Sequence, residues 1–529
     1  MKANMYGTPT DCFSIGLTVA SVGAQVGTAL VTDPARRSFS ELLGVVPDAA
    51  AHDPADARVT AVCTDSRQVT PGSLFIAIKG FSADGHRYVA DAVGRGAAAI
   101  VYEEPATADE LPAPVAAARV PDSRRAAALL ATEFHRWPSK ELALVGVTGT
   151  NGKTTVACFL ESIFSAAGRA VGAVTTVGRR IAGESLPAPC TTPHSAELQE
   201  LLRRMVDAGV THAAMEVSSH ALALDGVLGC KFDAAVFTNL TRDHLDFHGS
   251  LDEYLAAKCR LFSEYAEAAG PEKRMVGILN ADDAAAEHIA RRAACPVTTY
   301  GIEADAAVRA RDIELTATGS TFALCTPDGE IPLHVPAAGR FNVYNAAAAA
   351  VCALAMGVEG DAVQAGLGSA PAVPGRFEFV REGQGFSVVV DYAHTPDGLR
   401  NVLRSARPIT EGRLLCVFGC GGDRDRTKRP VMGEVATRLA DFVIVTSDNP
   451  RSEDPRAIID EILAGAGSSQ YAVEPDREAA IKQAMAMARA GDTVVIAGKG
   501  HETYQQFRDH TVHFDDREVA RQVLRASRG

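Results

Sequence analysis

The glycine-rich segment VGVTGTNGKTT, residues 145–155, combines the residue types that bind a phosphate chain. Gly149 and Gly152 let the backbone wrap phosphate oxygens, Lys153 adds a cation, and the helical pattern that follows would point N–H groups at the ligand. The strict GxxxxGK[ST] pattern is missed at one position, because Val147 stands where the first glycine belongs. A glycine-rich turn without nucleotide is the alternative. Strand, Gly-Lys-Thr and helix coincide, however, so we predict an ATP site of Gly149, Thr150, Asn151, Gly152, Lys153, Thr154 and Thr155.

Polar side chains also follow two later apolar strand patterns. MEVSSHAL places Glu216 at a strand end, and TNLTRDHLDFH places a second polar cluster after the next strand. ATP chemistry needs Mg²⁺, which prefers oxygen ligands such as the Glu216 carboxylate and the Thr154 hydroxyl. His244 and His248 have the i, i+4 spacing of a metal pair, but no HExxH motif is present and a capped helix is the commoner explanation.

The stretch VTSDNPRSEDP, residues 445–455, opens an apolar strand pattern directly into Asp448, Asn449, Pro450 and Arg451. Proline fixes its own φ angle and lacks an N–H group, so the flanking side chains are held in a defined geometry. Arginine can bind a carboxylate through two parallel hydrogen bonds, and aspartate can accept from an ammonium group. A surface turn followed by a helix cap is the alternative.

Each of these clusters lies just after an apolar run and before a helical pattern. Strands that alternate with helices predict an α/β fold with parallel sheets, in which ligands bind outside the carboxyl ends of the strands. At 529 residues the chain is too long for one core. We therefore predict three domains, at residues 38–140, 141–374 and 375–529, after a poorly ordered N-terminal extension of residues 1–37.

The composition points to the cytoplasm. A net charge of −13 without a lysine or arginine stripe argues against nucleic acid and anionic membranes as partners. The 11 cysteines are scattered without a CxxC pair, which indicates a reducing compartment with neither disulfides nor a zinc site. Residues 12–32 carry no charge, but Gly, Ser, Thr and Gln interrupt them, so we expect an extension rather than a membrane span.

GTNGKTT resembles the phosphate loop of the Mur ligase family, ATP-dependent amino-acid ligases of bacterial cell-wall synthesis, and matching motifs extend from residue 38 through all three units. The resemblance implies a UDP-sugar-binding domain, a central ATP-binding domain like a P-loop ATPase, and a C-terminal Rossmann-like domain for the amino acid. It implies a monomer that uses ATP and Mg²⁺. Folylpolyglutamate synthetases share a related loop.

Roles for single residues are also implied by the resemblance. Glu216 and His244 are similar to the metal ligands of the family, beside Thr154, and Lys153 to its phosphate-binding lysine. Lys258 matches a lysine that reacts with carbon dioxide, because a carbamate, unlike an amine, can help hold a cation. Without the family, Lys258 would be interpreted as a solvent-facing helix lysine.

Substrate contacts are implied in all three units. The implied contacts to the uridine side of the substrate are Thr64, Ser66, Phe81, Ser82 and Ala83. The implied contacts to the muramoyl-peptide are Thr191, Thr192 and Ser218. The implied contacts to the nucleotide are Asn342, Asn345, Arg376 and Asp391. The implied contacts to the amino acid lie in the third unit and are Arg424, Asp448, Asn449, Pro450, Arg451, Gly498 and Glu502. The chain departs from the family at Gly226, where the family usually carries an arginine that touches substrate.

The resemblance also implies the amino acid, because DNPR is the form seen in members that add meso-diaminopimelate. We therefore predict an ATP-dependent ligase that joins meso-diaminopimelate to UDP-N-acetylmuramoyl-L-alanyl-D-glutamate through an acyl phosphate. Two alternatives stay open. A folylpolyglutamate synthetase should lack the uridine motif TDSR, and a P-loop ATPase that is not a ligase would need no amino acid.

Overall fold

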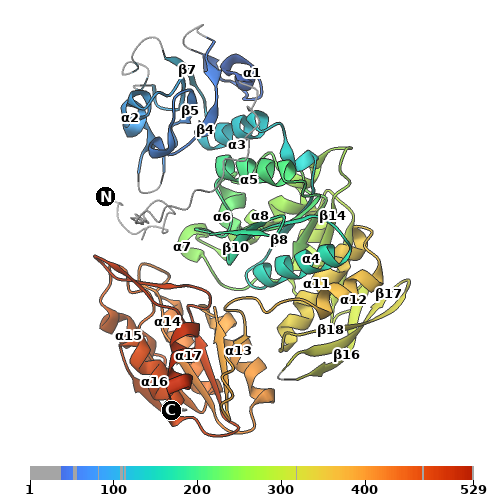
Figure 1. Ribbon diagram of the computed structural model, residues 1–529, viewed down its shortest axis with the longest axis vertical. Helices are drawn as coiled ribbons and strands as arrows, with labels where there is room; N and C mark the ends of the chain where they lie inside the picture. Colours follow the sequence, from blue (N-terminus) through green and yellow to red (C-terminus); the bar gives the residue numbers. More distant parts are fainter. Residues whose placement is uncertain are drawn as a thin grey trace.

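The computed structural model describes residues 37–51, 56–80, 83–105, 107, 111, 115–316, 318–467 and 470–526. Three large sheets follow one another along the chain, each covered by helices, and Figure 1 shows the three units in sequence order from blue to red. The α/β fold class predicted from the sequence is confirmed. Residues 1–36 of the expected extension, and the predicted contacts Phe81 and Ser82, lie outside the described residues.

The first unit is built on a five-stranded sheet in the order β2-β7-β6-β5-β4, in which only β2 is antiparallel to its neighbour. Leu74 and Val101 face one buried cluster and Phe75 and Ile100 face another, so the sheet is covered on both sides. Its elements are β1 (Arg37–Ser38), α1 (Phe39–Leu43), β2 (Ala50–Ala51), β3 (Arg58–Val59), β4 (Ala61–Cys63), η1 (Ser66–Gln68), β5 (Ser73–Ile76), η2 (Gly85–Tyr88), α2 (Val89–Gly94), β6 (Ala99–Tyr102), β7 (Ala116–Arg119), α3 (Ser123–Phe134) and η4 (Pro138–Lys140).

The central unit has an eleven-stranded sheet in the order β11-β10-β9-β12-β8-β13-β14-β15-β16-β17-β18, parallel from β9 to β16. Its elements are β8 (Ala143–Thr148), α4 (Lys153–Ala166), β9 (Val171–Thr175), β10 (Gly178–Ile181), β11 (Glu184–Leu186), α5 (Ser195–Asp207), β12 (His212–Glu216), α6 (Ser219–Ala223), β13 (Ala234–Phe237), α7 (Leu245–His248), α8 (Leu251–Phe262), α9 (Glu264–Ala269), β14 (Val276–Asn280), α10 (Ala285–Arg292), β15 (Val297–Gly301), β16 (Val308–Leu315), β17 (Ser320–Thr326), β18 (Gly329–Val335), α11 (Arg340–Ala355) and α12 (Gly360–Gly368).

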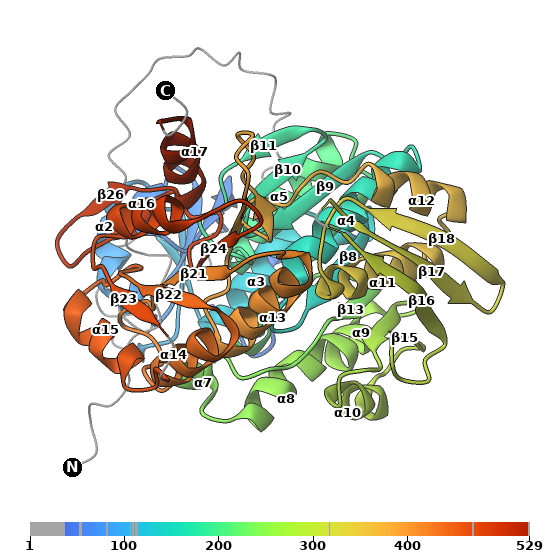
Figure 2. The same cartoon turned by 90° about the horizontal axis from the view of Figure 1, so that it is seen from below.

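Alternation along β8 explains why this sheet is buried on both faces. Val145 and Val147 join the core under α4, α11 and α12, whereas Leu144 joins the core under α5 and α8. Figure 2 shows α4 and α11 lying together along one face of the sheet. A parallel strand covered on both sides requires the continuous apolar run that the sequence has before the phosphate loop.

The third unit has a six-stranded sheet in the order β19-β20-β24-β21-β22-β23, parallel except for β19. Helices α13, α14 and α15 cover one face, and α16 and α17 the other. Its elements are β19 (Glu378–Phe379), β20 (Ser387–Asp391), α13 (Pro396–Ala406), η5 (Arg407–Ile409), β21 (Leu414–Phe418), α14 (Lys428–Leu439), β22 (Phe442–Val445), α15 (Pro455–Leu463), β23 (Tyr471–Val473), α16 (Arg477–Met487), β24 (Thr493–Ala497), β25 (Tyr504–Gln506), β26 (Thr511–His513) and α17 (Asp516–Ala526).

The strand order brings the predicted clusters together. β12, β8 and β13 are neighbours in the central sheet, so Glu216, the phosphate loop and the loop after β13 share one edge. β20, β24, β21 and β22 are neighbours in the third sheet, so the segments after these strands do the same. No helix within the part of the chain that the structure describes is long and apolar enough to span a membrane.

Candidate active site

The phosphate loop between β8 and α4 is packed tightly at both of its predicted glycines. Gly149 and Gly152 have φ angles of 143° and 89°, a region that favours glycine. A Cβ atom on Gly149 would lie 1.9 Å from Oγ1 of Thr238, and one on Gly152 would lie 2.4 Å from Oδ1 of Asn345. Backbone conformation and space therefore both require glycine at these positions.

Two lysine side chains converge on this loop from different helices. Lys153, at the start of α4, donates from Nζ to the carbonyl oxygens of Gly149 at 3.0 Å and of Thr150 at 2.9 Å. Lys258 of α8 donates to the same Gly149 oxygen at 2.9 Å, and it is 1% exposed. Burial lowers the pKa of both lysines, and the charge of Lys153 helps to lower that of Lys258 well below its usual range.

The segment after β13 holds the middle of the phosphate loop. Oδ1 of Asn239 accepts from the N–H of Asn151 at 2.9 Å, and the Asn239 amide donates back to the Asn151 carbonyl at 3.1 Å. The hydroxyl of Thr150 lies 3.1 Å from the hydroxyl of Tyr254, a residue of α8. The protein itself therefore fixes the conformation of the loop.

Glu216 lies among the residues predicted to bind the acceptor. Its carboxylate is 1% exposed, and Oε1 accepts from the N–H of Thr176 at 2.7 Å and from the Thr176 hydroxyl at 2.9 Å. The Thr176 hydroxyl lies 3.2 Å from Oγ1 of Thr191, and the Thr192 hydroxyl donates to the Glu216 carbonyl at 2.9 Å. The N–H of Ser218 donates to the Thr192 hydroxyl at 3.0 Å. The predicted residues Thr191, Thr192, Glu216 and Ser218 thus form one network.

His244 comes just before α7 with a φ angle of 52°. Its N–H donates to Oδ1 of Asp243 at 2.9 Å, and its ring lies edge-on to that of His220 with centres 4.7 Å apart. Burial and nearby cations lower the pKa of His244, so its imidazole is neutral and keeps a lone pair. His248 instead lies 2.9 Å from the Ser219 hydroxyl, so the i, i+4 spacing reflects helix geometry. Among the described residues no group of three or more His, Cys, Asp or Glu side chains is placed to hold a metal ion.

A cavity of about 280 Å³ opens beside the start of α4, between the central and third units. Its lining includes Thr155, Phe159, Pro336, Asn342, Arg376 and Phe377. Of the two asparagines predicted to contact the nucleotide, Asn342 lines this cavity, whereas Asn345 packs against Gly152 and donates to Oδ1 of Asn342 at 3.2 Å. Aromatic and apolar walls with a few polar groups suit a nucleotide base.

Arg376 joins the third unit to the phosphate loop. It donates from a terminal nitrogen to the Thr154 hydroxyl at 3.1 Å, and its guanidinium lies 4.4 Å from the centre of the Tyr392 ring. Asp391 accepts from the N–H of Phe377, next to Arg376, at 2.7 Å. Burial raises the pKa of Asp391 to about 6, against the opposing effect of Arg376.

The start of the segment after β22 is buried, so the alternative of a surface turn is wrong for Asp448 and Asn449, whereas the expected helix cap is present at Asp454, which precedes α15. Asp448 is 8% exposed and Asn449 is 1% exposed. The Asn449 amide donates to Glu502 at 2.8 Å, and the fully buried Lys499 donates to both Asn449 and Glu502 at 3.0 Å. A Cβ atom on Gly498 would lie 2.6 Å from Oδ2 of Asp448. The predicted residues after β22 and β24 are therefore in direct contact.

The loops after β21 and β22 carry two arginines with few partners. Arg451, with a φ angle of 51°, donates to the Gly422 carbonyl at 2.7 Å, and Arg424 donates to the Asp423 carbonyl at 3.0 Å. Nε of Arg451 is buried without a hydrogen-bond partner among the described residues. Burial and the charge of Arg451 lower the pKa of Arg424. Two cations this close favour binding of an anion.

The remaining predicted contacts lie in or near the first unit. Thr64 and Ser66 follow β4, and Ala83 is exposed on a later loop. Figure 1 shows the first unit at the far side of the central unit from the third, so these residues lie apart from the other clusters. Gly226 donates to the Ala221 carbonyl at 2.7 Å, and it offers the acceptor no side chain where the family usually has arginine.

Sequence reasoning missed Thr176 and Lys499, which touch predicted residues. Without the family resemblance it would also have placed Lys258 on a helix surface, whereas Lys258 is buried. One sequence pattern could have indicated that Lys258 is buried. Tyr254, Lys258 and Leu261 lie at i, i+4 and i+7 in α8, so Lys258 falls on the apolar stripe that faces the core. Thr176 and Lys499 depend on contacts between segments and carry no local pattern.

Family comparisons cover all three units. Residues 58–135 match the Mur ligase family catalytic domain, residues 147–353 the Mur ligase middle domain, and residues 375–500 the Mur ligase glutamate ligase domain. A UDP-N-acetylmuramoyl-L-alanyl-D-glutamate–2,6-diaminopimelate ligase of Geobacillus thermodenitrificans is 47% identical over 489 residues, which is 92% of this chain and 99% of that protein.

Solved structures of Mur ligases resemble this chain along most of its length. A structure of a UDP-N-acetylmuramoyl-L-alanyl-D-glutamate–2,6-diaminopimelate ligase is similar with a TM-score of 0.65 and 34% identity, over 93% of this chain and 100% of that one. A MurF ligase from Thermotoga maritima in complex with ADP shares the fold at 19% identity, with a TM-score of 0.61 over 88% of this chain and 96% of that one. The family predicted from GTNGKTT is confirmed: the chain belongs to the Mur ligase family.

Proposed function

We propose that this enzyme is the ATP-dependent ligase that joins meso-diaminopimelate to UDP-N-acetylmuramoyl-L-alanyl-D-glutamate in peptidoglycan precursor synthesis. The observation that carries the proposal is the pair Arg424 and Arg451, which donate to backbone carbonyls, together with the buried Asp448, whose carboxylate is influenced by the charge of Arg451. Glu502 lies in the same cluster, bonded to Asn449 and Lys499. The names of the relatives, at 47% identity over nearly the whole chain, support the same activity.

The amino-acid site fits the outer end of meso-diaminopimelate. That end carries a carboxylate and an ammonium group, whereas lysine has only the ammonium. The guanidiniums of Arg424 and Arg451 would bind the carboxylate, and Asp448 and Glu502 would accept from the ammonium. Within the described residues neither arginine has a salt bridge to a carboxylate, so the site penalises lysine, which would bring them no anion.

ATP would bind across the phosphate loop and the cavity beside α4. The N–H groups at the start of α4, with Lys153 and Arg376, would hold the phosphates, and Asn342 would line the base pocket. The acceptor carboxylate would attack the γ-phosphate, giving an acyl phosphate and ADP, and the incoming amine would displace phosphate. The protein contributes positioning and charge stabilisation to both steps.

Glu216 and Thr154 would offer Mg²⁺ the carboxylate and hydroxyl oxygens that it prefers, and the neutral imidazole of His244 would add a nitrogen donor, as the family resemblance implies. When bound, Mg²⁺ neutralises the charge of the phosphates. A carbamate on Lys258 would supply further anionic oxygens. The lowered pKa of the buried Lys258 supports this modification, since it favours the neutral amine, the form that reacts with carbon dioxide.

We assign residues 38–140 to the UDP-sugar, residues 141–374 to ATP and residues 375–529 to the amino acid, and we place the enzyme in the cytoplasm. Ten cysteines of the described residues are free, which suits a reducing compartment.

A coupled assay of ADP release tests the proposal. We expect turnover only when the muramoyl-dipeptide and meso-diaminopimelate are both present. Release of ADP when a folate and glutamate are supplied would support a folylpolyglutamate synthetase. Release of ADP without any amino acid would support a simple ATPase. Either result would overturn the proposed function.

A further inference from the structure

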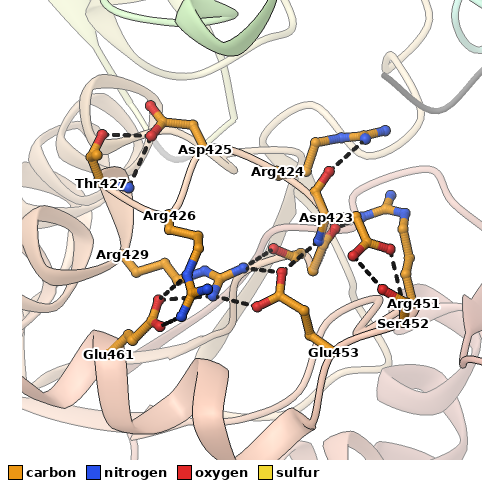
Figure 3. A network of polar contacts seen from close by, with 12 residues as sticks. Asp423, Arg424, Asp425, Arg426, Thr427, Arg429, Arg451, Ser452, Glu453 and Glu461 are labelled. Carbon is orange, nitrogen blue, oxygen red and sulfur yellow. Dashed lines mark hydrogen bonds and ion pairs between the residues drawn. The ribbon is translucent and has the colours of Figure 1, made fainter. Parts of the chain in front are cut away.

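Arg429, on the first turn of α14, has no part in the site described so far, yet its side chain is fully buried. It donates to both carboxylate oxygens of Glu453 at 2.8 Å, to Glu461 at 2.8 Å and to the Gly421 carbonyl at 3.2 Å. Figure 3 shows Arg429 between the two glutamates at one end of a polar network, with Arg424 and Arg451 at the other end. A cation with this many partners fixes the segments that supply them.

The network ties the loop after β21 to the segment after β22. Glu453 also accepts from the N–H of Asp423 at 2.6 Å. The two carboxylate oxygens of Asp423 accept from the hydroxyl of Ser452 at 2.5 Å and from its N–H at 3.1 Å. Asp423 is next to Arg424 in the chain, and Ser452 is next to Arg451. The residues adjacent to the two arginines are thus bonded to each other, and Arg429 holds them through Glu453.

This connection opposes two unfavourable features. The side chains of Arg424 and Arg451 both approach Gly421, so their charges repel each other, and burial together with this repulsion lowers the pKa of Arg424. Asp423 and Arg451 also have φ angles of 53° and 51°, a conformation that costs free energy for residues other than glycine. Without a tie between the loops, repulsion and backbone strain would both move the two guanidiniums from their present spacing.

We propose that Arg429 and Glu453 are positioning residues that set the spacing of Arg424 and Arg451, and thereby the selectivity for an amino acid with a second carboxylate over lysine. The inference rests on the proposed function. Neither Arg429 nor Glu453 touches the substrate in this proposal, and both act through the paired arginines.

Kinetics of Arg429→Lys and Glu453→Gln test the proposal. Lysine has no fork to bond two carboxylates at once, and glutamine loses the charge that holds Arg429. We expect the KM for meso-diaminopimelate to rise roughly 10- to 100-fold, as for a site misplaced by about 1 Å, while the KM for ATP stays unchanged. The preference for meso-diaminopimelate over L-lysine should shrink.

Arg426→Ala is the matched control. Arg426 lies three residues before Arg429 and also pairs with Glu461, but its side chain is 65% exposed and it does not touch Glu453. This variant should keep the wild-type KM. Melting temperatures of all variants show whether a change is only a loss of stability.

A double variant distinguishes positioning from general stability. If Glu453 acts through Arg451, then Glu453→Gln should change the KM for meso-diaminopimelate by less than about threefold once Arg451→Ala is present. A fully additive effect, or a KM that stays at the wild-type value in Glu453→Gln, would overturn the inference. Failure of Arg429→Lys to fold leaves Glu453→Gln as the deciding variant. A wild-type enzyme that ignores meso-diaminopimelate would instead overturn the proposed function.

Discussion

The side-chain nitrogens of Lys153 and Lys258 donate to one and the same oxygen, the carbonyl of Gly149, at 3.0 and 2.9 Å. The two nitrogens therefore lie within roughly 6 Å of each other, where two positive charges repel strongly in a buried site. Lys258 is the more deeply buried, and burial together with the charge of Lys153 lowers its pKa well below the usual range. A carbamate at Lys258 would replace this repulsion by attraction to Lys153.

Lys153→Ala should abolish ADP release, because the phosphates lose their cation. The fold should survive, since the hydrogen bonds that the Lys153 amine makes to described residues go to carbonyls of its own loop. The sequence alone would place the Lys153 side chain in solvent before a nucleotide binds, but it is half-buried, so the melting temperature is measured beside activity. Unchanged turnover would remove the phosphate loop from the mechanism.

Lys258→Ala should be nearly inactive, and short carboxylic acids such as acetate should restore part of the activity by taking the place of the carbamate. The exposed Lys482 of α16, which pairs with Glu478 on the surface, offers a control in Lys482→Ala. ADP release with and without acetate measures both effects. A fully active Lys258→Ala enzyme contradicts a role for the carbamate.

Arg451→Ala should reduce kcat/KM for meso-diaminopimelate by roughly two or more decades, since loss of one partner of a buried charged pair costs about 3–5 kcal/mol. The KM for ATP should hardly move, because the phosphate loop belongs to another sheet. Arg456→Ala is the control, as Arg456 is exposed on the same segment. Intact use of meso-diaminopimelate by Arg451→Ala, or turnover of L-lysine by the wild type, would show the assignment to be wrong.

Gly152→Ala and Gly168→Ala separate backbone strain from crowding at the site. Both glycines flank α4 and have φ angles of 89° and 72°, so both variants carry a similar conformational cost of about 1–2 kcal/mol. Only Gly152 has a neighbour that a Cβ atom would meet, Oδ1 of Asn345 at 2.4 Å. We expect the KM for ATP to rise about tenfold or more in Gly152→Ala alone. Equal effects in the two variants would argue against a close-packed loop.

Asp391 predicts a pH dependence of stability. Its pKa is raised from 3.8 to about 6 by burial, so between these values the folded chain binds more protons than the unfolded chain. The stabilisation that the protonated Asp391 carboxyl gives the folded state is fully present below pH 4, and it is lost as the pH rises through 6. Asp391→Asn removes the titration, so its free energy of unfolding should increase relative to wild type between pH 4 and 7. Urea titrations across this range measure the difference, and parallel curves would contradict the raised pKa.

The fold and the strand-end residues could be predicted because their signals are local. An apolar run followed by Gly-Lys-Thr, or by DNPR, specifies both a strand and the position of the polar group at its end. Parallel pairing then brings Glu216 beside the phosphate loop without further information.

Buried charges could not be predicted, because their partners are distant in the sequence. Arg429 is 24 residues from Glu453 and 32 from Glu461. Lys499 is 50 residues from Asn449. A charged residue in a helix or loop is usually exposed, and only the packing of two strand-end loops makes these residues internal.

The proposed ATP-binding and amino-acid-binding residues lie on two different sheets, which would make this enzyme modular. In the proposed site, a change within residues 448–451 would alter which amine is accepted, but it would leave β8, α4 and their hydrogen bonds as they are. Two side-chain hydrogen bonds link the third unit to the phosphate loop, one from Arg376 to Thr154 and one from Asn151 to Asp397. Substitutions in one loop could therefore change which amino acid is added to a cell wall during evolution, while the phosphate loop and its hydrogen bonds stayed the same.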